Sequence, residues 1–150
     1  MLCLNWLEKQ SLKGKTVIDF GCGSGILGIA ALLLGAEKVW AIDNDPQALF
    51  ASRDNAQRNG IEDHRLVTLL PQQIPAQAKA DITLANILAK PLIDLAPQIS
   101  ELTLDLGQLC LSGILSHQVD QVAAAYTEQF TFAPTGLEDN WARLSATKNS

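Results

Sequence analysis

The chain has 150 residues, of which 47% are apolar, 18% charged and 5% aromatic. This length predicts a single domain over residues 1–150, large enough to bury a core without disulfides or a structural metal. Eleven Lys and Arg against sixteen Asp and Glu give a net charge of -5, which argues against nonspecific binding to a nucleic-acid backbone.

Strand patterns and helix patterns alternate along most of the chain. Short β-type runs predict strands at residues 17–20, 38–42, 66–70, 82–85 and 108–115. Helical patterns with capping residues predict helices at residues 25–34, 46–59, 91–104 and 116–130. The alternation then stops, and residues 130–137 and 141–147 predict an antiparallel hairpin.

This order of elements predicts an α/β fold with a mostly parallel sheet covered by helices on both faces. Sheets of this kind bind ligands at the carboxyl ends of their strands. Polar residues and glycines gather after the predicted strands, at residues 19–25, 43–45, 70–73 and 86. We therefore expect the ligand site at that edge of the sheet.

The segment at residues 19–25, Asp-Phe-Gly-Cys-Gly-Ser-Gly, places three glycines at alternate positions between a strand and a helix. Glycine permits positive φ and close backbone approach, so Gly21, Gly23 and Gly25 predict a loop that cradles a ligand. A tight turn alone would need a single glycine. The ligand interpretation is therefore favoured over a purely geometric one.

Two ligand classes fit this loop. Gly23, Gly25 and Gly28 match the G-x-G-x-x-G spacing of dinucleotide-binding proteins, and Asp43 stands where an acid binds a ribose in either class. Asp19 before the loop favours a cationic ligand over a diphosphate, and so indicates S-adenosylmethionine. In that case Gly28 serves helix packing against the sheet.

Three polar residues carry alternative interpretations. Asp43 either binds the ribose or caps the next helix, and Asp45 directly before Pro46 fits the cap better. Asp19 either accepts hydrogen bonds from the glycine-loop amides or faces the amino group of the ligand. Asn86 either orients the acceptor amine or the cofactor through its amide oxygen, or caps a helix beginning near Ile87.

The remaining reactive side chains are interpreted as structural. His64 and His117 are predicted on the surface, and Cys22 has no partner that would make it a nucleophile. Cys3, Cys22 and Cys110 lie far apart in sequence and show no zinc spacing, which is typical of reduced thiols. With no apolar run of membrane-spanning length, we expect a cytoplasmic protein with no metal site.

The amino-terminal helix carries a run of apolar residues: Leu2, Leu4, Trp6 and Leu7. This pattern suggests an exposed apolar surface that could serve dimerisation.

Five segments together resemble the catalytic domain of the PrmA family, bacterial methyltransferases that modify ribosomal protein L11. They are residues 17–27, 41–48, 51–60, 85–89 (Ala-Asn-Ile-Leu-Ala) and 111–115 (Leu-Ser-Gly-Ile-Leu). The first marks S-adenosylmethionine enzymes in general, whereas its combination with the last two is specific.

The resemblance implies a Rossmann-like class I methyltransferase fold with a seven-stranded sheet, S-adenosylmethionine as cofactor, and methylation of lysine and N-terminal amino groups of ribosomal protein L11. It places family cofactor contacts at Gly21, Asp43 and Asn86, and another, a threonine in the family, just before Leu2, where this chain has Met1. The family also has an N-terminal substrate-recognition domain, which we expect to be absent from this sequence.

Alternatives remain open at this point. They are a methyltransferase for RNA or a small molecule, a dinucleotide-dependent oxidoreductase, and a cofactor-binding fragment that is inactive without its recognition domain.

Overall fold

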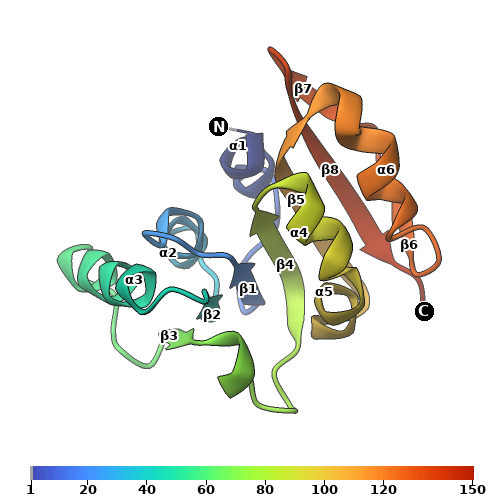
Figure 1. The fold of residues 1–150 in the computed structure, drawn as a ribbon. Helices are drawn as coiled ribbons and strands as arrows, with labels where there is room; N and C mark the ends of the chain where they lie inside the picture. The colour runs from blue at the N-terminus through green and yellow to red at the C-terminus, as the bar shows by residue number, and fades with distance from the viewer. Residues whose placement is uncertain (1) are drawn as a thin grey trace.

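One sheet organises the computed structural model, which describes residues 2–150 (Figure 1). Met1, the position at which the resemblance replaces a family threonine, lies outside the described residues. The strand order is β3-β2-β1-β4-β5-β8-β6, and β7 also pairs with β8. The strands are β1 Thr16–Phe20, β2 Lys38–Ile42, β3 Leu66–Leu69, β4 Ala80–Asn86, β5 Thr103–Leu115, β6 Phe130–Phe132, β7 Gly136–Glu138 and β8 Trp141–Lys148.

The first five strands pair in parallel, and β8 runs antiparallel to β5. Both β6 and β7 pair with β8, so they share the last position of the sheet. The sheet thus has eight strands in place of the seven that the resemblance implies, because β6 and β7 share one position, and its C-terminal part is antiparallel as expected. The strand predicted at residues 130–137 is interrupted around Pro134, which has no N–H to donate to a ladder.

Within residues 2–150 there are six α-helices, the first of which precedes β1. They are α1 Leu2–Glu8, α2 Ile26–Leu33, α3 Pro46–Arg58, α4 Ala89–Asp94, α5 Ala96–Leu102 and α6 Val119–Ala124, with short 3-10 turns at Pro71–Gln73 and Ser116–Gln118. The prediction of one continuous helix over residues 91–104 is wrong, because α4 and α5 are separate helices. Leu95 is both the C-cap of α4 and the N-cap of α5, and Pro97 lies in the first turn of α5, where its missing N–H costs nothing.

Two other predicted boundaries are wrong. β5 begins at Thr103, earlier than the predicted residue 108, and Leu106 within it adopts a positive φ of 65°. The helix predicted over residues 116–130 is shorter, because α6 ends at Ala124 and a turn leads to β6.

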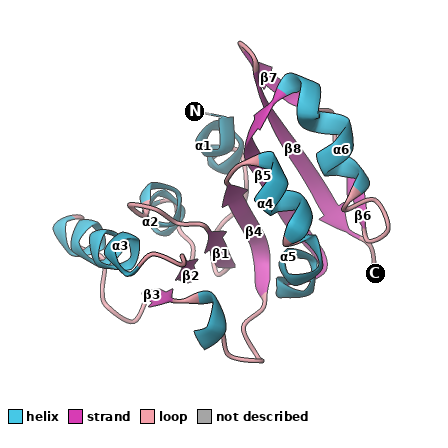
Figure 2. Ribbon diagram, viewed as in Figure 1, coloured by secondary structure: helices cyan, strands magenta, loops and turns pink. Residues whose placement is uncertain are grey.

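Helices cover both faces of the sheet (Figure 2). Alternate residues of β1 point to opposite sides, and Val17 belongs to a core with α1, α2 and α3, whereas Ile18 belongs to a core with α4, α5 and α6. Trp6 and Leu7 are buried in the first core, at 7% and 0% exposure. The expected exposed surface on the first helix is therefore wrong for Trp6 and Leu7, which α1 packs inward, whereas Leu2 and Leu4 are half-buried.

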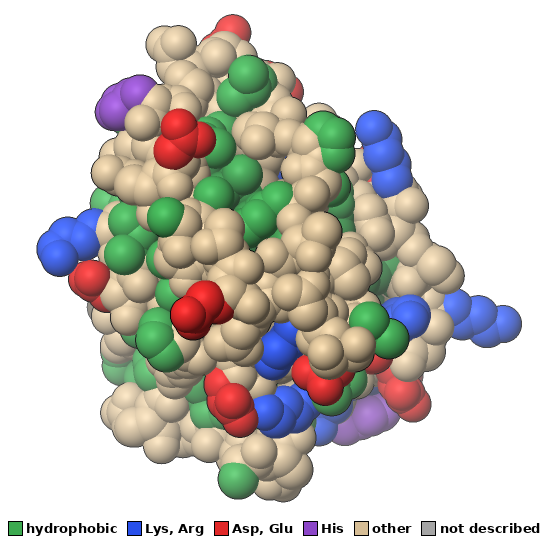
Figure 3. Space-filling view, turned by 90° about the vertical axis from the view of Figure 1, so that its right-hand side faces the viewer, with side chains coloured by type: hydrophobic (Ala, Val, Ile, Leu, Met, Phe, Trp, Pro, Cys, Tyr) green, Lys and Arg blue, Asp and Glu red, His purple; other side chains and the backbone are tan. Residues whose placement is uncertain are grey.

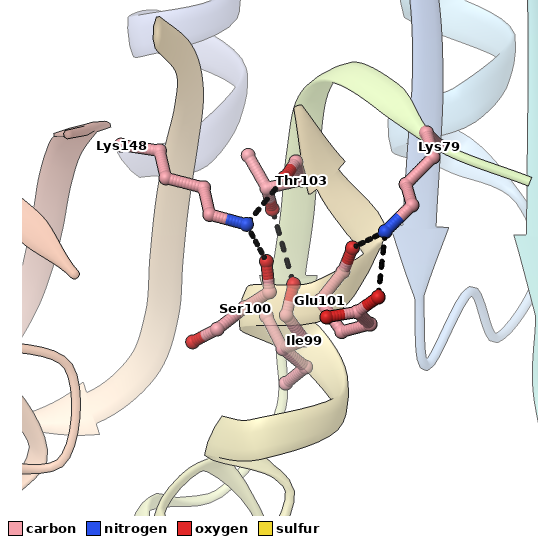
Figure 4. A network of polar contacts seen from close by, with 6 residues as sticks. All are labelled: Lys79, Ile99, Ser100, Glu101, Thr103 and Lys148. Carbon is pink, nitrogen blue, oxygen red and sulfur yellow. Dashed lines mark hydrogen bonds and ion pairs between the residues drawn. The ribbon is translucent and has the colours of Figure 1, made fainter. Parts of the chain in front are cut away.

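The C-terminal strand is tied to α5 by a buried lysine (Figure 4). Lys148 Nζ donates to the carbonyl oxygens of Ser100 at 2.7 Å and Thr103 at 2.8 Å. Both carbonyls lie at the end of α5, where Thr103 is the C-cap and its N–H also donates to the carbonyl of Ser100. A cation is also favourable at this end of a helix. The contact fixes β8 against the junction of α5 and β5.

Candidate functional site

The glycine loop after β1 is held open in a conformation that only glycine adopts readily. Gly21, Gly23 and Gly25 have φ of 79°, 56° and 86°. The N–H groups of Gly21 and Cys22 both donate to the carbonyl of Ile42, at 2.7 and 2.9 Å. A Cβ added to Gly23 would meet no atom within 4 Å, so the loop faces free space at this position.

Asp43 follows β2 and binds the glycine loop. Its Oδ2 accepts from the N–H of Gly23 at 3.0 Å, and its Oδ1 accepts from the N–H of Asp45 at 3.0 Å. Asp45, not Asp43, caps α3, because the Asp45 carboxylate accepts from the N–H of Gln47 at 3.0 Å. This division agrees with the sequence interpretation and leaves Asp43 at the edge of the sheet beside the loop.

Asp19 is buried at 2% exposure, and its Oδ2 accepts from the N–H of Gly28 at 3.2 Å. Burial raises the pKa of this carboxyl to about 7, the Gly28 hydrogen bond opposes the rise, and the charge of Asp43 adds to it. A Cβ on Gly28 would approach Val39 Cγ1 to 3.0 Å. Gly28 therefore has the packing role predicted for it.

Asn86 is the exposed last residue of β4, and its Oδ1 accepts from the hydroxyl of Ser112 at 3.0 Å. It does not cap a helix, because α4 begins at Ala89 with Leu88 at its N-cap. The capping alternative for Asn86 is thus wrong.

Two hollows meet at the carboxyl ends of β1, β2 and β4. The larger, of about 450 Å³, includes Gly21, Asp43, Asn44 and a wall of mostly apolar residues: Phe20, Ile42, Pro71, Ile87, Leu88, Pro91, Leu95 and Gln98. The smaller, of about 220 Å³, is lined by Asp19, the loop residues 21–24, Ile26, Leu27 and Asn86. Gly21 lines both hollows.

Five of the six predicted site residues line these two hollows: Asp19, Gly21, Gly23, Asp43 and Asn86. The sixth, Gly25, lines neither hollow and is the N-cap of α2. Among the described residues that line them, the only charged ones are Asp19 and Asp43. Sequence reasoning missed the apolar wall from Ile87 to Gln98. Its signal was the apolar composition of the segment after β4.

The other hollow and the thiols described next either lie outside this site or are unreactive. A hollow of about 500 Å³ over α3 and β3 contains no glycine-loop residue. Burial raises the pKa of Cys22 to about 12, and its Sγ lies 3.4 Å from Ser52 Oγ, so this thiol is no nucleophile. The Sγ atoms of Cys3 and Cys110 approach to 3.1 Å, although the two residues are distant in sequence. All three cysteines are free, as expected.

Within residues 2–150, no group of three or more His, Cys, Asp or Glu is placed to hold a metal ion. His64 lies on the surface, with its side chain 76% exposed. In the same part of the chain, no helix has the length and apolar character needed to cross a membrane.

Comparison with known proteins gives a consistent result. The family described as ribosomal protein L11 methyltransferase (PrmA) matches residues 1–149. The ribosomal protein L11 methyltransferase of Enterobacter sp. (strain 638) is 58% identical over 147 residues, which cover 98% of this chain and 50% of that protein. The chain spans about half the length of the curated relatives it matches.

Solved structures agree with this match. The ribosomal protein L11 methylase of Lactobacillus delbrueckii subsp. bulgaricus has a TM-score of 0.90 and 34% identity, covering 99% of this chain and 78% of that chain. The tRNA m1G37 methyltransferase of M. jannaschii shares the fold, with a TM-score of 0.81 at 17% identity, over 99% of this chain and 49% of that one. The chain has the Rossmann-like fold of class I methyltransferases and belongs to the ribosomal protein L11 methyltransferase (PrmA) family.

Proposed function

We propose that this chain binds S-adenosylmethionine and transfers its methyl group to amino groups of a protein. The proposed substrate is ribosomal protein L11, the substrate named for its relatives. The observation that carries the proposal is the pair of hollows that meet at Gly21 and whose only charged lining residues, among those described, are acidic. Such a lining suits a ligand with a sulfonium and an ammonium group and is unfavourable for a diphosphate.

The larger hollow fits the adenosine part of this cofactor. Its wall of apolar residues, with Pro71, Leu88 and Leu95, provides surfaces for a purine ring, and Asp43 provides acceptors for ribose hydroxyls. The smaller hollow fits the amino-acid part, with Asp19 and Asn86 beside the free space at Gly23. The Asp19 carboxyl, held partly protonated by burial, becomes a counter-charge when an ammonium group lies near it.

When bound, S-adenosylmethionine supplies an electrophilic methyl group on a sulfonium. The protein then has to align donor and acceptor for in-line displacement, and little acid or base catalysis is required. The acceptor amine has to be neutral, and for a free lysine at pH 7 this costs about 4 to 5 kcal/mol. Ile26 and Leu88 line the two hollows and are 53% and 69% exposed. Their apolar surfaces remove water from an approaching ammonium group and favour its neutral form.

The residues after Asn86 favour an aliphatic amine as the acceptor. They are Ile87, Leu88 and Ala89, so this segment offers no aromatic ring to stack on a planar base. The distribution of charge also argues against a nucleic-acid substrate. On the face shown in Figure 3, Lys and Arg are interspersed with Asp and Glu. That face has no continuous basic surface for a nucleic-acid backbone. A ribosomal protein substrate also assigns the reaction to the cytoplasm.

The test is a calorimetric titration of the chain with S-adenosylhomocysteine, the reaction product, beside NADH as the competing ligand class. The proposal expects saturable binding of S-adenosylhomocysteine and none of NADH. Binding of NADH alone overturns it. Transfer is then measured by mass spectrometry of purified ribosomal protein L11 incubated with the chain and S-adenosylmethionine. Added methyl groups on lysine or the N-terminus support the activity, and methylation of RNA in its place contradicts it.

A further inference from the structure

A hydrogen bond across two strands fixes the side chain of Asn86. Asn86 and Ser112 are register partners at the carboxyl ends of β4 and β5. The Ser112 hydroxyl donates to Asn86 Oδ1 at 3.0 Å, and Ser112 is only 5% exposed. A hydroxyl on a buried strand residue has few alternative orientations. It therefore fixes the exposed amide at the mouth of the smaller hollow.

The backbone of β5 is shaped for this contact. The pairing of β5 with β8 loses its regular register between Leu111 and Ile114, the segment that contains Ser112 and Gly113. Gly113 has a φ of 85°, and a Cβ there would lie 2.7 Å from the carbonyl oxygen of Ile87 and 3.0 Å from Asn86 Oδ1. Irregularities of this kind often re-aim a side chain next to a site. Here the irregularity and the glycine let β5 pass directly beside Asn86.

The chemistry of the amide then determines what Asn86 can offer to a ligand. An asparagine side chain has one acceptor oxygen and one NH₂ donor group. The oxygen already accepts from Ser112 through one of its two lone pairs, whereas both N–H bonds of Nδ2 are available as donors in the smaller hollow, which Asn86 lines together with Asp19 and Gly21. A donor at this place matches an oxygen atom of a ligand. It does not match the N–H of an incoming amine, which needs an acceptor.

We infer that Ser112 is a positioning residue, which orients the Asn86 amide so that Nδ2 donates to a carboxylate or hydroxyl oxygen of the cofactor. This inference rests on the function proposed above, and it reverses the sequence expectation that the Asn86 oxygen orients the ligand. It also gives a role to the Ser-Gly pair at residues 112–113, which the sequence alone leaves without one.

The orientation is testable without any ligand. In the amide NMR spectrum of the free protein, the side-chain NH₂ pair that disappears in Asn86→Asp is the pair of Asn86. We expect Ser112→Ala to shift this pair and speed its hydrogen exchange. Ser145→Ala is the matched control, because it removes a buried hydroxyl from the neighbouring strand opposite Cys110. An Asn86 NH₂ pair that is the same in Ser112→Ala and in the unmodified protein overturns the inference.

The link to the cofactor is tested by titration with S-adenosylhomocysteine. One neutral hydrogen bond that orients a contact is worth about three- to tenfold in affinity, so Ser112→Ala is expected to weaken binding by this factor. Ser112→Thr, which keeps the hydroxyl, restores it. Asn86→Asp, which replaces the donor by an acceptor, weakens binding at least as much as Asn86→Ala. Asn86→Asp that binds as tightly as the unmodified protein overturns the donor assignment.

A double-mutant cycle separates positioning from general structural damage. Ser112→Ala is expected to have no further effect on affinity once Asn86 is alanine. Equal losses in both backgrounds overturn the positioning role. A chain that binds no S-adenosylhomocysteine at all contradicts the proposed function itself, whereas normal binding without coupling between Ser112 and Asn86 contradicts only this inference. Thermal melting of each variant confirms that it is folded.

Discussion

Asp43 Oδ2 accepts a hydrogen bond from the backbone N–H of Gly23 at 3.0 Å, so the acid that follows β2 holds the loop that follows β1. The two residues are brought together by the parallel pairing of these strands. The contact makes the shape of the glycine loop depend on a side chain that is also proposed to bind the cofactor ribose.

Asp43→Ala is expected to weaken binding of S-adenosylhomocysteine by more than tenfold, because it removes the ribose acceptors and releases the Gly23 N–H. It should also lower the free energy of unfolding by about 1 to 2 kcal/mol. Asp45→Ala is the matched control, since the Asp45 carboxylate caps α3 and does not accept the hydrogen bond from Gly23. It should cost about 1 kcal/mol of stability and leave the dissociation constant unchanged. Equal affinity in the two variants would contradict the role of Asp43.

Gly23→Ala tests the free space above the loop. The added methyl group meets no protein atom within 4 Å. The free energy of unfolding should therefore fall only by the strain of holding an alanine at a φ of 56°, about 1 kcal/mol. The same methyl group enters the space proposed for the cofactor, so affinity for S-adenosylhomocysteine should fall by at least tenfold. Gly60→Ala, with a φ of 72° and equally free space, should show the same stability cost with unchanged binding. Calorimetry and urea unfolding of both variants decide the point.

Asp19 makes stability depend on pH in a predictable direction. Its pKa is raised from 3.8 to about 7 in the folded state, so the folded chain binds this proton more tightly than the unfolded chain. Its contribution to stability is therefore complete below about pH 4 and is lost as the pH rises through 7. Between about pH 5 and pH 8, the free energy of unfolding should fall by roughly 2 kcal/mol more than in Asp19→Asn. Urea unfolding at both pH values measures the difference, and parallel pH profiles would refute the prediction.

Lys148→Met removes two hydrogen bonds to the carbonyls of Ser100 and Thr103 at the end of α5 (Figure 4). Two buried acceptors would lose a charged donor, so the free energy of unfolding should fall by roughly 2 to 3 kcal/mol. The matched control is Lys79→Met, which breaks an ion pair with the exposed Glu101 and a hydrogen bond to the Glu101 carbonyl in the same region. Exposed pairs contribute little, so this variant should melt close to the unmodified chain. Similar losses in both would contradict the importance of burial at Lys148.

The parallel strands and the glycine loop were predictable from sequence because their signals are local. A run such as residues 39–42 is apolar throughout, as is typical of a strand covered on both faces, and three alternating glycines mark a backbone that no other residue adopts readily. The role of Asp45 as a cap was equally visible, because it stands next to Pro46. Asp43 could then be assigned to the site by elimination.

The features that sequence reasoning missed depend on distant contacts. The inward packing of Trp6 and Leu7 is decided by how α1 meets the sheet, as the contact between Cys3 and Cys110 illustrates. The break between α4 and α5 had a signal in Pro97, but a proline also fits within the first turn of a helix. The bond between Ser112 and Asn86 requires the register of two strands, which apolar patterns do not specify to one residue.

The order of strands in the sheet has a consequence for thermodynamic linkage. Gly21, Asp43, Asn86 and Ser112 lie at the ends of β1, β2, β4 and β5, which are neighbours in space but are spread along most of the chain. The hollows are lined from the ends of β1, β2 and β4, and Asn86 is held from β5, so the complete site exists only when all four strands are paired. A ligand that spans them binds the native ensemble alone, so each tenfold rise of its concentration above the dissociation constant adds about 1.4 kcal/mol to the global free energy of unfolding. Ligand binding at the site and folding of the whole sheet are therefore thermodynamically coupled.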